Sequence, residues 1–368
     1  MNVIVLGGGL MGTATAYFLA RRGIRVTLID RRKVGSGATI ASFGNIRRSG
    51  RHLPQLPLAR RSLTLWHELQ GLLGRDVEFR ATGHLRLIFD TESLEDMRAF
   101  AEAARRYDLD LEELGPNQIR TRYPGLGPDA IAASFSPEDG SANPRLVSPA
   151  FAHAAARLGA TVVDETAVAS ARHTGAGFSV ETESGTFHSD ALLNCTGAWG
   201  AGIAAAFGEP VPIEMRGPQM AVTEPLPHRV HPVVGMWSRD HGGYLRQVER
   251  GNVVFGGAAE RTQADPETGH ARPDPASLPV QLRSVLRLLP ALRDVAVIRQ
   301  WSGCEGYVAD MLPVMGPSRT TPGLFHAFGF SGHGFQLGPG VGDAMAELIA
   351  TGRCDTPLAP YAIDRFAA

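Results

Sequence analysis

Three glycines near the start of the chain have the spacing of a dinucleotide-binding turn. Gly7, Gly9 and Gly12 form the pattern G-x-G-x-x-G directly after an apolar run at residues 3–6, and Asp30 ends the next apolar run. Glycines permit a tight turn close to a pyrophosphate, the following helix N-terminus stabilises its charge, and the acid accepts hydrogen bonds from a ribose. A glycine turn in an unrelated α/β protein is the alternative, but all the required parts occur here in order. We predict dinucleotide contacts from Gly7, Gly9, Leu10, Met11, Gly12, Asp30 and Arg31.

A second run of small residues favours FAD over NAD, which the glycine pattern alone does not separate. Residues 35–39, "GSGAT", would bring more backbone amides and hydroxyls to the cofactor, whereas NAD-binding chains more often continue into another helix–strand unit. The stretch "LLNCTGAWG" at 192–200 ends in a turn that would approach the same cofactor, although an ordinary strand-to-helix turn has the same pattern. The further predicted contacts are Gly37, Ala38, Thr39, Ser42, Asn45, Val168, Thr196, Gly197 and Trp199.

The elements that must position these residues are of two kinds. Helical spacing at residues 10–22 separates two apolar strands, whereas residues 83–90 alternate as a half-buried strand and strands dominate from 218 to 257. A last helix is expected at about 339–351, with Pro339 in its first turn. The pattern predicts a doubly wound α/β domain interrupted by an antiparallel, strand-rich substrate domain. We expect residues 1–80, 140–212 and 300–368 in the first domain, and residues 81–139 and 213–299 in the second.

Composition narrows the function classes. The chain has 368 residues, enough for two domains, and a formal net charge of −1, so no general attraction to nucleic acid or anionic membranes is expected. Three cysteines lie far apart without metal-binding spacing, which predicts no metal site and fits a reducing compartment. No apolar run approaches the length of about 18 residues that a membrane span needs. A cytoplasmic location is therefore expected.

Seven stretches give the chain a resemblance to a known family. The stretches are "GGGLMGTATAYFLARRG", "GSGATIASFGNIR", "ATGHLRLIFD", "FSPEDGSANP", "LLNCTGAWG", "RQWSGCEGYVADMLPVMG" and "GFSGHGFQLGPGVG". The "W-x-G" and "D-x-x-P-x-x-G" positions within residues 301–316 and the glycine-rich stretch at 329–342 are the more specific matches. With these stretches the chain resembles the D-amino-acid-oxidase-like FAD oxidoreductases of the glycine and sarcosine oxidase group, and is most similar there to the flavin-bearing β subunits of heteromeric L-proline dehydrogenase and sarcosine oxidase.

The resemblance implies FAD, held without a covalent bond, with its isoalloxazine between the two domains and "GHGFQ" near the pyrimidine edge. It implies hydride transfer from a carbon beside an amine nitrogen, which leaves an imine that water hydrolyses. The substrate would be an amino acid or secondary amine such as proline, hydroxyproline, sarcosine or an opine-like compound, and α- and γ-type subunits would be the partners of such a chain. The flavin contacts implied are Gly303, Gly332, His333, Gly334, Phe335 and Gln336.

Four side chains are expected at the substrate. Arg47, in "GNIR", matches an arginine that pairs with the substrate carboxylate in sarcosine-oxidase relatives, unless it lies on a solvated loop. Glu305 departs from relatives that carry a carboxylate-binding arginine there, and would attract a cation or hydroxyl if it is not on a surface turn. Gln336 replaces a lysine after "GHGF", and Tyr244 lies on a strand that could reach the pocket.

The electron acceptor is inferred from missing lysines. Lys33 is the only lysine of the chain and lies in the nucleotide-binding segment, so no lysine stands where related oxidases activate oxygen. A dehydrogenase is therefore expected, because negative charge develops in the first step of oxygen reduction. Cys304 misses the register of covalent flavin attachment and is expected to be structural. A peroxide-producing oxidase and an electron-relay subunit remain the alternatives.

Overall fold

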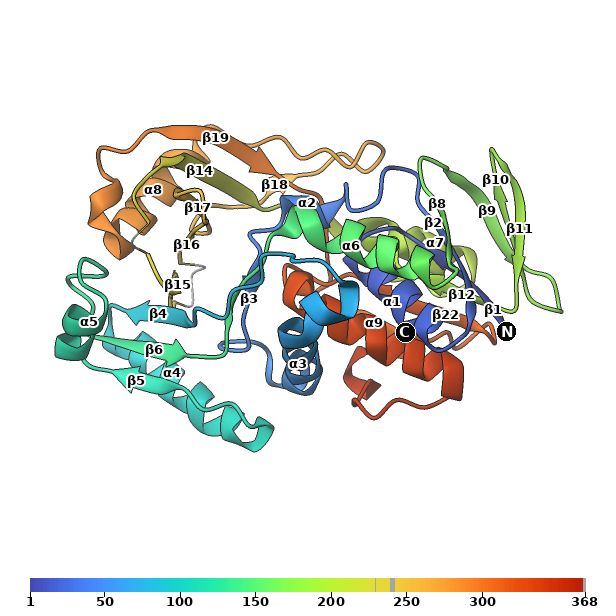
Figure 1. The fold of residues 1–368 in the computed structure, drawn as a ribbon, viewed down its shortest axis with the longest axis horizontal. Coiled ribbons are helices and arrows are strands. Elements are labelled where there is room, and N and C mark those ends of the chain that lie inside the picture. Colours follow the sequence, from blue (N-terminus) through green and yellow to red (C-terminus); the bar gives the residue numbers. More distant parts are fainter. Residues whose placement is uncertain (229, 239–241, 367–368) are drawn as a thin grey trace.

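The computed structural model describes residues 1–228, 230–238 and 242–366. Two large sheets organise the chain, and they lie at opposite ends of its long axis (Figure 1). Within the described part of the chain, no helix is both long and apolar enough to cross a bilayer. The predicted α/β class with a second, strand-rich half is confirmed.

A six-stranded sheet forms the nucleotide-binding half. Its order is β21-β22-β12-β1-β2-β8, in which only β21 runs antiparallel to its neighbour. The apolar run of β1 is buried on both faces, as is typical of a parallel strand between two layers. The strands are β1 (Asn2–Leu6), β2 (Arg25–Ile29), β8 (Thr161–Val163), β12 (Ala191–Asn194), β21 (Val314–Pro317) and β22 (Leu324–Phe328).

The two faces of this sheet are covered differently. One face packs on α1 (Leu10–Arg21), α3 (Leu56–Leu73), α6 (Pro144–Arg157) and α9 (Gly334–Thr351). The other face packs on α7 (Gly200–Ala206) and on a three-stranded antiparallel sheet, rather than on helices alone as a doubly wound fold would have it. This sheet, at the right of Figure 1, contains β9 (Val168–His173), β10 (Phe178–Thr182) and β11 (Gly185–Ser189).

An eight-stranded sheet forms the other half. Its order is β19-β14-β17-β16-β15-β4-β6-β5, and only β15 and β4 pair in parallel. Leu85 and Leu87 of β4 point to an apolar cluster with α5 (Pro116–Arg122) and α8 (Ser277–Leu288), so His84 and Arg86 face the opposite side. The strands are β4 (His84–Ile88), β5 (Glu112–Leu114), β6 (Ala132–Ser136), β14 (Gln219–Pro225), β15 (Val233–Met236), β16 (Tyr244–Gln247), β17 (Asn252–Gly256) and β19 (Val297–Ser302).

Short pairings link the two halves. β3 (Asn45–Ile46) pairs with β7 (Gly140–Ser141), and β13 (Glu214–Gly217) pairs with both β18 (Thr262–Gln263) and β20 (Glu305–Tyr307). The boundary expected at residue 300 falls inside β19, which pairs with β14 of the larger sheet. We therefore propose that the last segment of the nucleotide-binding domain begins after Ser302.

The last helix begins earlier than expected. α9 starts at Gly334 and contains Pro339 in its second turn, so the prediction of a start at 339 is wrong. Its glycines let three helices pack closely, because a Cβ added at Gly338 would overlap Leu10 of α1, and one added at Gly340 would lie 2.7 Å from Ser62 Cβ of α3. Packing thus offsets the low helix propensity of glycine.

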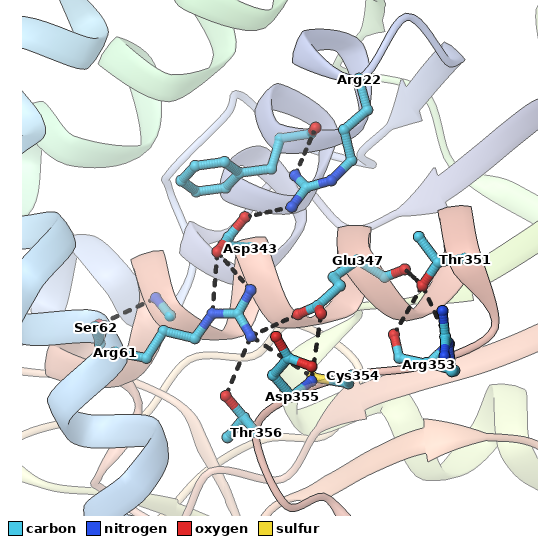
Figure 2. A network of polar contacts seen from close by, with 12 residues as sticks. Arg22, Arg61, Ser62, Asp343, Glu347, Thr351, Arg353, Cys354, Asp355 and Thr356 are labelled. Atoms are coloured by element: carbon cyan, nitrogen blue, oxygen red, sulfur yellow. Dashed lines mark hydrogen bonds and ion pairs between the residues drawn. The ribbon is translucent and has the colours of Figure 1, made fainter.

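An ion-pair network ties this helix to the chain around it (Figure 2). Arg61 of α3 binds Asp343 through Nε at 3.0 Å and Glu347 through Nη1 at 2.8 Å, and Arg22 binds Asp343 at 2.8 Å. The side chains of Arg61, Asp343 and Glu347 are each 19% exposed. Removing Arg61 from this network would take the arginine partner from the partly buried Glu347 and leave Asp343 with Arg22 alone.

Arg61→Ala is expected to lower the free energy of unfolding by about 2 kcal/mol at neutral pH, measured by chemical denaturation. Burial raises the pKa of Asp343, but hydrogen bonds from Arg22 and Arg61 outweigh it and lower the pKa overall. The carboxylate therefore stabilises the fold above its unfolded pKa, and this contribution is lost as pH falls through the lower folded value. The difference between variant and wild type should shrink in acid. Arg105→Ala, which removes an exposed pair with Glu102, is the matched control and should cost less than about 0.5 kcal/mol.

Candidate active site

A cavity of about 520 Å³ lies at the carboxyl ends of the parallel strands, where α/β sheets bind ligands. Leu6, Ile29 and Cys195 line it from the ends of β1, β2 and β12. The predicted cofactor contacts that line it are Gly7, Gly9, Leu10, Met11, Asp30, Arg31, Gly37, Ala38, Thr39, Ser42, Val168, Thr196, Gly197, Trp199, Gly332, Gly334 and Phe335.

The glycine turn leads directly into α1. Gly7 has a φ of 104°, and a Cβ there would overlap the carbonyl oxygen of Cys195. A Cβ at Gly12 would overlap the carbonyl oxygen of Gly7, so Gly12 lets the helix pack on the strand and does not itself line the cavity. Gly9, in contrast, is open on the cavity side, because a Cβ there would meet only Thr39 Oγ1 at 3.7 Å. The three glycines therefore serve different purposes.

Asp30 is held at the cavity by backbone amides. Its Oδ2 accepts a hydrogen bond from the Gly8 N–H at 2.5 Å, and its Oδ1 accepts one from the Arg32 N–H at 2.7 Å. Burial raises the pKa of Asp30 more than these two hydrogen bonds lower it. Each oxygen keeps a further lone pair, so the carboxylate can accept two hydroxyl groups from a ligand.

A stacked pair flanks Asp30. The Arg31 guanidinium lies 3.9 Å from the ring centroid of Trp199, and both residues line the cavity. The indole N–H of Trp199 donates to the Pro266 carbonyl oxygen at 2.7 Å, which fixes the ring. This end of the cavity thus offers a planar, partly apolar wall suited to an aromatic group.

Three further predicted cofactor contacts, described here in turn, lie outside the cavity lining. Gly303 allows close packing on α2 (Ala38–Ala41), because an added Cβ would lie 2.5 Å from Ala41 Cβ. Asn45 Nδ2 lies 3.4 Å from His84 Nε2. The carbonyl oxygen of His333 accepts from Arg51 at 3.1 Å, and burial lowers the pKa of His333 well below its ordinary value, so the ring is neutral.

Gln336, expected at the substrate, points elsewhere. Its side-chain Nε2 donates to the Ala59 carbonyl oxygen of α3 at 2.8 Å, and the residue is 1% exposed. Its own carbonyl oxygen accepts hydrogen bonds from Ser62 and Trp66 of the same helix. The early start of α9 turns this side chain toward α3, so the structure corrects the expectation that it contacts substrate or flavin.

Glu305 lines the cavity from β20, so it is not on a solvated turn. Its Oε2 accepts a hydrogen bond from the Tyr307 hydroxyl at 3.0 Å. Burial raises the pKa of Glu305 more than this hydrogen bond and the charge of Arg261 lower it. Tyr244 lies close enough that the charges of Glu305, Arg261 and Arg47 all act on its pKa, which burial raises above its ordinary value. Tyr244 and Glu305, each expected at the substrate, therefore lie near each other.

Arg47 lies inside the protein and not on a solvated loop. Its Nη1 donates to the Ser49 carbonyl oxygen. Burial lowers the pKa of Arg47, while the charges of Asp139 and Tyr244 raise it. The carboxylate of Asp139 accepts from the backbone N–H groups of Arg48 at 3.0 Å and Ser49 at 3.4 Å. Arg47 thus has charged neighbours but forms no ion pair with any residue the structure describes.

Three charged neighbours of this region were not anticipated from the sequence. Arg86 of β4 donates to the Met236 carbonyl oxygen at 3.1 Å and stacks on Trp237 at 4.0 Å. Arg51 donates to the Arg47 carbonyl oxygen at 2.7 Å, and Arg261 lies 4.3 Å from the Tyr307 ring centroid. The signal for Arg86 was present in "GHLRLIF", where strand alternation buries the leucines and places His84 and Arg86 on one common face.

Comparison with known proteins adds the family. The family model described as FAD dependent oxidoreductase matches residues 2–348. The crystal structure of L-proline dehydrogenase from P. horikoshii superposes with a TM-score of 0.92 at 29% identity, covering 99% of this chain and 97% of that chain. Glycine oxidase of Geobacillus kaustophilus is 27% identical over 373 residues, which cover 99% of this chain and 97% of that protein.

The chain spans different shares of the length of two further relatives. Sarcosine oxidase subunit beta of an Arthrobacter species is 27% identical over 375 residues, covering 99% of this chain and 91% of the subunit. Human sarcosine dehydrogenase is 26% identical over 387 residues, which cover 99% of this chain but 41% of that protein.

Proposed function

The chain belongs to the FAD dependent oxidoreductase family, as its motifs predicted, and we propose that it oxidises the carbon–nitrogen bond of an amino acid or secondary amine as a dehydrogenase. The observation that carries the proposal is the lining of the cavity. It includes both the glycine turn with Asp30 and the carboxyl group of Glu305. Tyr244 and Arg47 do not line the cavity, but the charges of Glu305 and Arg47 both act on the pKa of Tyr244.

FAD is the cofactor of this family, and the lining suits its parts. The open side of Gly9 accommodates a pyrophosphate at the N-terminus of α1, and Asp30 has free lone pairs for a ribose. Gly332, Gly334 and Phe335 line the cavity at the N-terminus of α9, whose unpaired N–H groups would favour negative charge on a flavin ring. When bound, FAD accepts the hydride from the substrate. Burial raises the pKa of the Cys304 thiol, which keeps it protonated and favours non-covalent binding.

Side chains at the flavin end would orient the substrate. Arg47 presents a guanidinium that suits a carboxylate bidentately. Glu305 offers its carboxyl group to the amine nitrogen, and its raised pKa suits it to hold a proton that the substrate ammonium releases. Tyr244 stacks edge-on against Phe43 with ring centroids 4.7 Å apart, which excludes water from this side.

The preference for a dehydrogenase rests on the lining. Lys33 is exposed and does not line the cavity, and the chain has no other lysine. A peroxide-producing oxidase is the second candidate, because the glycine oxidase relative is a full-length match and the buried arginines supply positive charge near the flavin end.

The two candidates differ in electron acceptor. With the FAD-loaded chain and a reducing amine, we expect an artificial dye to be reduced at least about tenfold faster than peroxide forms in air, which corresponds to a barrier difference of about 1.4 kcal/mol. Stoichiometric peroxide at the rate of dye reduction would establish the oxidase instead.

Partner subunits are part of the proposal. The chain spans most of a protein named as a subunit, sarcosine oxidase subunit beta, which supports a role as the flavin-bearing subunit of a larger assembly. If electrons only pass through the chain and catalysis lies in a partner, no amine should reduce FAD in the isolated chain. A cytoplasmic location stays a prediction.

A further inference from the structure

Two guanidinium groups lie close together in the region of Tyr244. A Cβ added at Gly50 would overlap Arg86 Nη1 and would lie 3.6 Å from Arg47 Nη1, so both guanidinium groups lie close to Gly50. Arg47 comes from the segment after β3, whereas Arg86 comes from β4 of the other sheet. The two halves of the molecule thus each contribute one cation to the same place.

Within the part of the chain that the structure describes, no ion pair neutralises this positive charge. Burial, and then the charge of Arg47, lowers the pKa of Arg86 well below its ordinary value, which is the sign of a like-charged, desolvated pair. Neither arginine forms an ion pair with a carboxylate among residues 1–228, 230–238 and 242–366. Asp139 is the buried carboxylate whose charge acts on Arg47, and it already accepts hydrogen bonds from two backbone N–H groups. Arg51 is a third cation nearby, since burial and then the charge of Arg47 lower its pKa. An anion that joins such a desolvated cluster would be bound favourably.

The N–H groups of Arg47 and Arg86 that remain without a partner can bind more than one carboxylate. A guanidinium carries five N–H donors, of which Arg47 uses one on Ser49 and Arg86 uses two on Met236, leaving four and three. One carboxylate has about four lone-pair sites, so it would leave donors and one positive charge unmatched. Both side chains keep part of their surface accessible although protein surrounds them, so a ligand can reach them.

We infer that the substrate carries two carboxylates, one bound by Arg47 and the other by Arg86. The inference rests on the proposed function, because it names the substrate class of the same site. It selects amino acids or secondary amines with a second acidic group over proline-like or sarcosine-like monocarboxylates. Arg86 is then the residue that determines this specificity.

The test uses ligands that cannot be oxidised as amines. Thiodiacetate and (methylthio)acetate have the same skeleton with sulfur in place of nitrogen, and differ by one carboxylate. Binding to the FAD-loaded chain is measured by calorimetry. We expect thiodiacetate to bind at least about tenfold more tightly than (methylthio)acetate, since a bidentate arginine–carboxylate contact has at least this effect.

Variants of Arg86 test whether this side chain binds the second carboxylate. Arg86→Met should remove at least about nine-tenths of the affinity for thiodiacetate and change the affinity for (methylthio)acetate less than about twofold. Arg86→Lys keeps the charge without the planar fork, so it should retain an intermediate preference even if the methionine variant folds poorly. Arg98→Met, which removes an exposed arginine paired with Glu113, is the matched control and should leave both affinities unchanged.

Two results would overturn the inference. The first is an equal affinity of the wild type for both ligands. The second is an equal loss of affinity for both ligands in Arg86→Met and Arg86→Lys, because the two arginines would then bind one and the same carboxylate. Failure of the proposed function looks different. In that case thiodiacetate would bind through Arg86, but neither iminodiacetate nor sarcosine, the corresponding amines, nor any other amine would reduce the FAD.

Discussion

Arg47→Ala is expected to weaken binding of every carboxylate ligand by about 100-fold, because a buried charge-assisted contact contributes about 2–3 kcal/mol. The backbone carbonyl of Arg47, which holds Arg51, is unchanged by this substitution, so the local structure should persist. The loss should appear in the dissociation constant of (methylthio)acetate and in KM for a carboxylate substrate. The rate of FAD reduction at saturating substrate should fall much less, since the group binds and orients the substrate and does not take part in hydride transfer.

Arg47→Lys serves as the matched variant. It keeps the charge but loses the planar fork, so its affinity should lie between those of the wild type and Arg47→Ala. Unchanged carboxylate affinity in Arg47→Ala would contradict the assignment of this side chain to the substrate pocket.

Gly9→Ala is expected to give a folded protein that has lost most of its FAD. The added methyl group would meet only Thr39 Oγ1 at 3.7 Å within the protein, and Gly9 has an ordinary φ of −71°, so neither a clash nor strain opposes folding. The methyl group projects where the pyrophosphate must approach the backbone, so the dissociation constant of FAD should rise by about 10- to 100-fold, the equivalent of about 1–3 kcal/mol of overpacking. Titration of the apoprotein with FAD measures this.

Two other glycine substitutions serve as comparisons for Gly9→Ala. Gly71→Ala changes an exposed position of α3 with open space around it and should leave both FAD affinity and stability at or above wild type. Gly12→Ala forces an overlap with the Gly7 carbonyl oxygen and should destabilise the apoprotein itself. If Gly9→Ala bound FAD as tightly as the wild type, the placement of the pyrophosphate at this turn would be wrong.

The part of the cavity at the glycine turn could be predicted from the sequence because its determinants are local. Gly7, Gly9 and Asp30 act through one strand–turn–helix–strand unit, and that unit fixes their relative positions. The prediction of Gln336 failed for the opposite reason. Whether α9 begins at Gly334 or Pro339 depends on packing against α1 and α3, and that decision turns the side chain toward Ala59.

The substrate end depends on contacts between distant segments. Arg47 and Arg86 lie close together because β4 of the larger sheet faces the segment after β3. The sequence around either arginine does not indicate that the other one lies nearby. The alternation in β4 identified the inward face but not what lies opposite. The same holds for Glu305, whose burial at the cavity follows from the pairing of β20 with β13.

The central claim is that this chain itself oxidises an amine at bound FAD, and an anaerobic titration tests it most directly. The purified, FAD-loaded chain is mixed without oxygen with amino acids and secondary amines, including iminodiacetate and sarcosine, while the visible absorbance of the FAD is followed. At least one of them should bleach the flavin, with iminodiacetate more effective than sarcosine and Arg47→Ala requiring higher concentrations. A flavin that dithionite reduces but no amine does would contradict the account.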